Sequence, residues 1–330
     1  MRKLLQSLAA AAVVLLACAA FPSPSGAQVT PQIWFHPPDP VHRRAFAHES
    51  DPEYVKLFEP GAPWQQAAAH VRILKIYTKY LLEGNEADLR AQFAWLKQHH
   101  IGLALEGPII VTGSSACGTK SEGYSTNGLA PSVIKKLRLL GAEPDYWTAD
   151  EPLFFGHSTT PRPGFDPCQL PIPKLAALAG SFTRQIRAAF PRIQFIDIEP
   201  ASNFPQANWP ALMGPWLNAY RHAAGAPFAA VIMDVAWWVK GWQQRALSLT
   251  QYLRSARVPT GVIYDGNSPE KSNRAWLAEA RQHWRQYESL VGGPPDIALF
   301  QSWAPQPVKL LPETSTDAFT NVVLDYARAH

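Results

Sequence analysis

The chain has 330 residues, of which 47% are hydrophobic and 17% are charged, and its formal net charge at pH 7 is +4. This length and composition suit one large globular domain with a substantial hydrophobic core. No run of Lys or Arg forms a basic patch, so the sequence gives no electrostatic reason to expect a nucleic-acid partner.

The first residues have the pattern of a secretion signal. Arg2 and Lys3 precede an apolar run from Leu8 to Phe21, and small residues then continue to Ala27. The run is shorter than the roughly 20 residues that cross a bilayer, and no later segment is apolar enough to form a transmembrane span. We therefore expect a signal peptide over residues 1–27 and a protein that is exported to the periplasm or the extracellular space.

Three cysteines add further constraints. The run Leu15-Leu16-Ala17-Cys18 resembles a bacterial lipobox, which leaves open a lipid anchor at Cys18 as in an outer-membrane lipoprotein; the alternative is a cysteine inside a discarded signal. Cys117 and Cys168 remain, an even number in an oxidising compartment, and we expect a disulfide between them. Such a bridge closes a loop of about 50 residues and contributes on the order of 4 kcal/mol of stability by the chain-entropy relation, whereas the alternative is two free buried thiols.

Eight short apolar runs recur along the chain. Each has the continuous hydrophobicity of a strand in a parallel sheet that is covered on both faces. The predicted strands are Gln32–His36, Arg72–Thr78, Ile101–Glu106, Tyr146–Ala149, Ile193–Glu199, Phe228–Asp234, Thr260–Asp265 and Ile297–Ser302.

Helical sequence follows every predicted strand except the first, after which the chain is irregular and has at most short helices before His70. The predicted helices are residues 85–99 with Asn85 as N-cap, 131–141, 175–190, 210–225, 243–256, 273–291 and 317–329 with Asp317 as N-cap. Their boundaries rest on capping residues, on glycines that end helices and on prolines that begin them. Two long polar loops, residues 112–129 and 156–173, carry the two remaining cysteines.

Strands that alternate with helices predict a single (β/α)8 barrel over residues 28–330, and this length fits that fold with insertions. The alternative is an open doubly wound sheet. Against it, no Gly-rich phosphate-binding loop follows the first predicted strand.

Carboxylates gather at the carboxyl ends of these strands. Asp150 and Glu151 follow the fourth strand directly, and Pro152 ends it. In a (β/α)8 barrel the catalytic groups lie at this end, whereas several acids placed at one rim for structural reasons would repel one another and lower stability. The polar and aromatic residues at the strand ends are His36, Tyr77, Glu106, Asp150, Glu151, Glu199, Asp234, Asp265, Gln301 and Trp303.

Carboxylates and aromatic residues without a cofactor motif favour glycoside hydrolysis. In that reaction one carboxylic acid protonates the leaving oxygen, a second carboxylate acts as nucleophile or base, and aromatic faces stack on sugar rings. The chain has 12 tryptophans, and Trp303 follows a predicted strand end directly.

The same residues carry a resemblance to a known superfamily. The run Thr148-Ala149-Asp150-Glu151-Pro152 resembles the Asn-Glu-Pro motif of clan A glycosidases, with Asp150 in place of Asn and Glu151 matching the acid/base glutamate. Ser302-Trp303 is similar to the tryptophan under the reacting sugar in that clan. The chain departs from the clan at the end of the seventh strand, where Tyr264-Asp265-Gly266 replaces the nucleophilic glutamate. Asp150, Glu199 and Asp265 also fall on strands four, five and seven, as the three acids of alpha-amylase-type barrels do.

We therefore expect an exported glycoside hydrolase that acts on a poly- or oligosaccharide and needs no cofactor or metal. Glu151 is the expected general acid/base, and Glu199 or Asp265 is the nucleophile or the base that activates water. Retention and inversion are both open, because the choice depends on the distance between the two carboxylates. The expected substrate-binding residues are His36, Lys75, Tyr77, Glu106, Asp150, Asp234, Trp237, Gln301 and Trp303.

Two other functions remain as alternatives. One is a carbohydrate-binding barrel without catalysis, which would keep the tryptophans and bind sugar after Glu151 is neutralised. The other is a metal-dependent hydrolase with His36 and the rim acids as ligands, although the chain has no HxH or HExxH motif.

Overall fold

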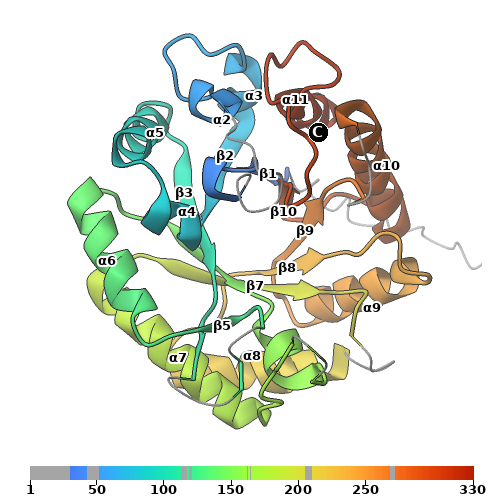
Figure 1. Cartoon of the computed structure of the whole chain (residues 1–330). Helices are drawn as coiled ribbons and strands as arrows, with labels where there is room; N and C mark the ends of the chain where they lie inside the picture. The colour runs from blue at the N-terminus through green and yellow to red at the C-terminus, as the bar shows by residue number, and fades with distance from the viewer. Residues whose placement is uncertain are drawn as a thin grey trace, which may run out of the picture.

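Eight parallel strands close into a barrel in the computed structural model, and helices surround it (Figure 1). Around the barrel the strands follow one another in the order β1, β2, β3, β6, β7, β8, β9 and β10, and β10 pairs with β1. Their bounds are Gln32–His36, Val71–Tyr77, Gly102–Gly107, Tyr146–Asp150, Gln194–Pro200, Val231–Asp234, Thr260–Tyr264 and Ile297–Gln301. The predicted (β/α)8 barrel is therefore confirmed.

The structure describes residues 30–42, 52–112, 117–118, 121–161, 163, 165–204, 210–267 and 272–330. The predicted signal peptide and the predicted lipobox at Cys18 lie outside these residues. Within the described part of the chain, no helix is both long enough and apolar enough to cross a membrane.

The helices form the outer layer. They are α2 (Pro52–Lys56), α3 (Gln65–His70), α4 (Thr78–Glu83), α5 (Glu86–Gln98), α6 (Leu129–Leu140), α7 (Ile172–Ala189), α8 (Pro210–Ala224), α9 (Trp242–Ser255), α10 (Asn273–Val291) and α11 (Phe319–Ala329). A π-helix, η1 (Phe154–Ser158), follows β6, and two short strands, β4 (Ile110–Val111) and β5 (Tyr124–Ser125), pair outside the barrel.

Capping side chains explain one helix boundary and correct another. Asn85 caps α5 as predicted, because its side chain accepts hydrogen bonds from the amides of Ala87 and Asp88. Asp317 was the predicted cap of the last helix, and this prediction was wrong. Its carboxylate instead accepts a hydrogen bond from Lys309 at 2.7 Å, and α11 begins two residues later without a side-chain cap.

Most strand boundaries differ from the prediction by one residue, and two places show a larger change in local structure. β2 ends at Tyr77 and the chain turns at once into α4, a helix that the sequence did not indicate. β8 begins at Val231 rather than at Phe228. The Phe228 ring packs against α8 instead, where it stacks on Tyr220 with ring centroids 3.5 Å apart.

The strand alternation divides the core into two layers. Inward-facing residues fill the barrel, among them Trp34, Ile73, Ile232 and Leu299, while the outward-facing residues pack against the helices. Trp34 is fully buried, and its ring contacts Tyr146 across the barrel at 4.8 Å. Among the described residues the interior is thus a packed core, and a cleft lies beyond the carboxyl ends of the strands.

We expect Gly261→Ala to lower the free energy of unfolding by about 1–3 kcal/mol, because the filled barrel cannot accept a methyl group. A Cβ at Gly261 would lie 2.6 Å from Cγ1 of Ile232 and 3.1 Å from Cβ of Ile297. Gly128→Ala is the matched control, since nothing lies within 4 Å of its Cβ and its φ of −83° suits alanine. Urea denaturation measures both variants, and equal effects would contradict a tightly filled interior.

Candidate active site

The carboxyl ends of the strands surround a cleft of about 950 Å³. Seven of the residues expected at the site line it: Tyr77, Glu106, Asp150, Glu151, Asp234, Gln301 and Trp303. The other five, which are His36, Lys75, Glu199, Trp237 and Asp265, do not. The structure thus brings most of the strand-end residues together and places the remainder below or behind the cleft wall.

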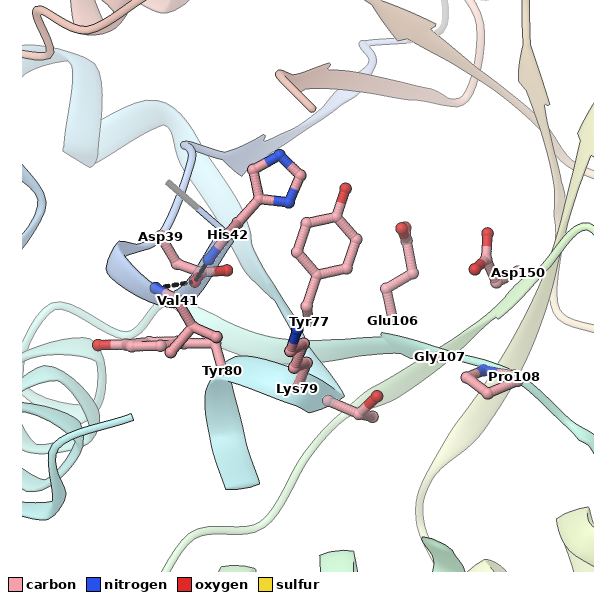
Figure 2. Close-up of a pocket in the computed structure, with 11 residues that line it drawn as sticks. Asp39, Val41, His42, Tyr77, Lys79, Tyr80, Glu106, Gly107, Pro108 and Asp150 are labelled. Atoms are coloured by element: carbon pink, nitrogen blue, oxygen red, sulfur yellow. Dashed lines mark hydrogen bonds between the residues drawn. The ribbon is translucent and has the colours of Figure 1, made fainter. Parts of the chain in front are cut away.

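Three neighbouring strands present polar side chains on the same inner face. Tyr77 on β2, Glu106 on β3 and Asp150 on β6 follow the inward positions of the paired strands. Figure 2 shows the three side chains in a row, with their polar ends pointing the same way. This row forms one side of the cleft.

A buried ion pair lies at the base of this row. Lys75 is fully buried on β2 and pairs through Nζ with Glu106 Oε2. Burial lowers the pKa of Lys75 to about 7, although the nearby carboxylates of Asp150 and Asp234 favour its charged form. Lys75 does not line the cleft itself, but its partner Glu106 does, and its charge acts on Asp150 and Asp234.

Two acids of the cleft, Asp150 and Asp234, hold their protons more strongly than in water. Burial, with Glu122 and Asp234 nearby, raises the pKa of Asp150 to about 7, against the opposing effect of Lys75. Burial also raises the pKa of Asp234 to about 6. Carboxyl groups with such shifts are suited to proton transfer near neutral pH.

Glu151 has a backbone conformation that few non-glycine residues adopt. Its φ of +47° lies in the left-handed region, and the residue is 9% exposed at the cleft surface. Burial and the nearby carboxylates, Asp234 first among them, raise the pKa of Glu151 well above its usual range. Glu151 is thus a carboxylic acid that stays protonated at a pH where ordinary glutamates are ionised.

Glu199 points away from the cleft. Ile196 and Ile198 of β7 face the barrel interior, so Glu199 faces outward on the same side as Asp197. Its two carboxylate oxygens accept hydrogen bonds from the amides of Leu153 at 2.7 Å and Phe154 at 3.0 Å. Glu199 therefore holds the turn that follows Glu151.

Asp265 and Trp237 are engaged with each other behind the cleft. The indole Nε1 of Trp237 donates to Asp265 Oδ1 at 2.6 Å, and the Trp237 ring stacks on His283 with centroids 4.4 Å apart. Asp265 is only 2% exposed, and burial raises its pKa well above the usual range.

His36 lies beneath the cleft. It is fully buried, and its ring packs edge-on against Tyr77 at 4.4 Å. Burial and the charge of Lys75 lower the pKa of His36 well below its usual value, so the ring is neutral. It supports the position of Tyr77 and does not itself line the cleft.

Two tryptophans form the aromatic part of the rim. Trp303 follows β10, and Trp238 follows β8 with 54% of its surface exposed. Their ring centroids are 6.4 Å apart at an angle of 63°. Of the adjacent residues Trp237 and Trp238, only Trp238 lines the cleft, so a ligand can contact Trp238.

Sequence reasoning missed the cleft residues that lie away from the strand ends. These include His42, Glu122, Phe154, Ser202, Asn203 and Arg245. None of them directly ends a predicted strand, so the strand-end rule could not find them. The His42 ring stacks on Tyr77 at 5.2 Å, and a sequence signal for this contact does not exist.

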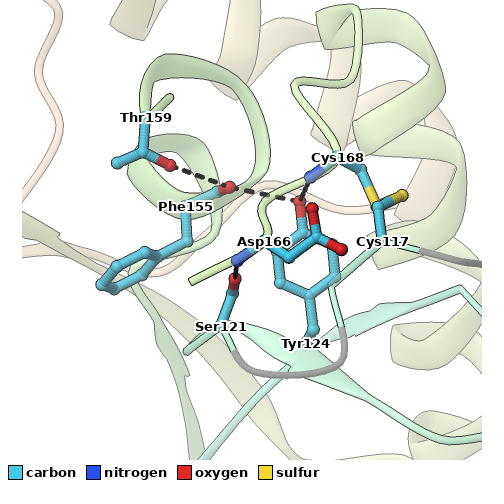
Figure 3. The surroundings of a disulfide bond; sticks show 7 residues. All are labelled: Cys117, Ser121, Tyr124, Phe155, Thr159, Asp166 and Cys168. Carbon is cyan, nitrogen blue, oxygen red and sulfur yellow. Dashed lines mark hydrogen bonds between the residues drawn. A yellow bond between two sulfur atoms is a disulfide. The ribbon is translucent and has the colours of Figure 1, made fainter. Parts of the chain in front are cut away.

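The predicted disulfide between Cys117 and Cys168 is present beside the cleft (Figure 3). The amide of Cys168 donates to the hydroxyl of Tyr124 at 2.9 Å, and that hydroxyl donates to the carbonyl of Phe155 at 3.1 Å. Phe155 lines the cleft, so the bridge helps to fix one of its walls. Across the described side chains, no three His, Cys, Asp or Glu residues are arranged to hold a metal ion.

No protein-family model matches the sequence, and a search of curated proteins found no match. Solved structures with a similar fold include GH5_18 from Streptomyces cattleya in complex with GlcNAc, with a TM-score of 0.48, 13% identity, and coverage of 84% of this chain and 71% of that one. D-psicose 3-epimerase from Clostridium cellulolyticum H10 has a TM-score of 0.46 and 11% identity over 90% and 98% of the two chains. The intracellular xylanase TsXylA from Thermoanaerobacterium saccharolyticum has a TM-score of 0.45 and 12% identity over 84% and 89%. Glycoside hydrolases and sugar epimerases are thus both among the neighbours, all of them distant, and the likeness does not decide between their reactions.

We expect Glu199→Ala to lower the free energy of unfolding by about 2–4 kcal/mol, because two buried amides lose their acceptor. Glu199→Gln keeps one acceptor oxygen and should cost less than half as much. Urea denaturation at pH 6 measures both variants. Unchanged stability of the alanine variant would contradict this structural role, and restoration of its catalytic activity by added azide would indicate a nucleophile instead.

Proposed function

We propose that this protein is an exported glycoside hydrolase that cleaves a glycosidic bond with a pair of carboxyl groups. The observation that carries the proposal is the pairing of Glu151 and Asp234 at one cleft. The pKa of Glu151 is raised well above its usual range, with Asp234 as the largest charge contribution, whereas that of Asp234 is raised only to about 6. Two carboxyl groups whose pKa values differ can serve as acid and base at the same pH.

Glu151 is the general acid in this mechanism. Its carboxyl proton passes to the glycosidic oxygen as the bond to the anomeric carbon breaks, so that the leaving group departs as an alcohol. The resemblance of Asp150-Glu151-Pro152 to the acid/base motif of clan A glycosidases supports the same role. The buried setting of Glu151 keeps the proton on this residue until the substrate takes it.

Asp234 is the second carboxylate. It lines the cleft from β8, whereas the carboxylates of Glu199 and Asp265 are occupied by backbone amides and by Trp237, respectively. Above pH 6 Asp234 is ionised and can attack the anomeric carbon or take a proton from an attacking water. Asp150, Glu106 and Gln301 then bind sugar hydroxyls, and Trp303 and Trp238 offer aromatic faces to a sugar ring.

Export is part of the same proposal. The Cys117–Cys168 disulfide supports an oxidising compartment, and the first residues have the pattern of a secretion signal. The mass of the exported chain distinguishes cleavage after Ala27 from a lipid anchor at Cys18.

We expect the protein to release sugar from at least one member of a broad polysaccharide panel, and Glu151→Gln to reduce kcat at least about 100-fold while ligand binding is kept. The matched control is Glu122→Gln, an exposed cleft acid, which should change kcat less than about tenfold. Equal release by the wild type and Glu151→Gln would remove Glu151 from the mechanism. No release by either protein, with glycan binding by both, would favour a carbohydrate-binding barrel.

The pH dependence of kcat/KM should be bell-shaped, since Asp234 must be ionised and Glu151 must be protonated. Activity is lost as the pH falls below about 6, where Asp234 gains a proton, and again as the pH rises through the elevated pKa of Glu151. Asp150→Asn removes a negative charge that raises the pKa of Glu151, so the alkaline limb should move to lower pH. An alkaline limb that stays in place would show that another group sets it.

A further inference from the structure

A second, smaller cavity of about 220 Å³ opens from the cleft beside Glu106 and Asp150, and we call it the side pocket. The cleft and the side pocket share Tyr77 and His42 as well as the two acids. Figure 2 shows the side pocket between Val41 and Tyr80 on one side and Pro108 on the other. A ligand bound against Asp150 therefore has a substituent-sized space next to it.

The walls of the side pocket are mostly carbon. Val41, Pro108 and the rings of Tyr77 and Tyr80 supply most of this surface. Glu106 and Asp150 stand where the pocket meets the cleft, and Asp39 lines the wall beside Val41. A hydroxyl group against the carbon part of these walls would lose its hydrogen bonds to water and gain none there, whereas a methyl group would gain from leaving water.

The side pocket is held open by its surroundings. The carboxylate of Asp39 accepts hydrogen bonds from the amides of Val41 at 2.9 Å and His42 at 2.8 Å, which fixes this part of the wall. The Tyr80 ring packs edge-on against Tyr54 with centroids 5.3 Å apart. A preformed apolar recess beside a polar site is the usual means of selecting a substrate by one substituent.

We propose that the side pocket takes a short acyl group, such as an acetyl group, on the sugar bound beside Asp150. The substrate class is then an N- or O-acetylated glycan. This inference rests on the proposed function, because it names the substrate of the same cleft. A carboxylate or sulfate substituent fits less well, since Glu106 and Asp150 stand at the entrance and would repel it.

The test compares glycans that differ only in acetylation. The probes are tri-N-acetylchitotriose against cellotriose, and O-acetylated xylan before and after removal of its acetyl esters by mild alkali. We expect kcat/KM, or the affinity of Glu151→Gln measured by calorimetry, to be at least about tenfold higher for the acetylated member of at least one pair. No preference in either pair would overturn the inference.

Two variants connect a preference to the side pocket. Val41→Phe fills the pocket and should abolish the preference, so that kcat/KM becomes about equal for the acetylated and the unacetylated glycan. The kcat/KM for the unacetylated glycan should stay the same. If circular dichroism shows that Val41→Phe folds poorly, the same measurement is made with Pro108→Leu, a substitution in the opposite wall of the pocket. A preference that survives the filled pocket would place acyl recognition elsewhere and overturn the inference.

Lys79 also lines the side pocket, and its ammonium group would attract an anion. Lys79→Ala should leave the acetyl preference unchanged. Loss of activity of this variant on a uronic acid polymer such as pectate, with activity on that polymer in the wild type, would assign the pocket to an anionic substituent. Failure of the proposed function gives a different result. In that case the wild type and Glu151→Gln release no sugar from any of the probes.

Discussion

Closure of the sheet is the constraint on which the site depends. In a closed parallel barrel each strand is paired on both sides, so the phase of its alternation is fixed and cannot slip by one residue. Asp234 and Glu199 both lie near strand ends. The alternation of side chains along each strand places Asp234 in the cleft and directs Glu199 outward, toward the turn after β6. An acidic residue thus lines the cleft on β8 and anchors backbone amides on the neighbouring strand β7.

The cleft acids are a cost to the fold. A carboxyl group whose pKa is raised binds its proton more tightly in the folded protein than in the unfolded chain, so its contribution to stability falls as the pH rises between the two pKa values. For Asp150 and Asp234 this range runs from about 4 up to about 7 and about 6. The ion pair of Lys75 with Glu106 offsets part of the repulsion, and the buried apolar residues inside the barrel and between barrel and helices stabilise the fold against the rest.

The sequence predicted the barrel and its strand order because apolar runs and capping residues are local signals, as at Asn85. It predicted which residues end the strands, but it could not predict their direction. On β7, Asp197 and Glu199 share one face and Ile196 and Ile198 share the other, but both faces of a parallel sheet are buried, so polarity does not tell which face is inside the barrel. Cleft residues away from the strand ends, such as His42 and Glu122, depend on tertiary contacts, which no local pattern records.

The backbone at Glu151 explains how two adjacent acids reach one cleft. Successive residues of a strand point to opposite sides, so Asp150 and Glu151 could not both face the ligand if the chain stayed extended. The left-handed conformation at Glu151 breaks the alternation directly after β6, and Glu199 then accepts hydrogen bonds from the next turn. Such a conformation costs free energy and persists only where its surroundings determine it, which makes the outward-facing Glu199 a condition for the placement of the proposed acid.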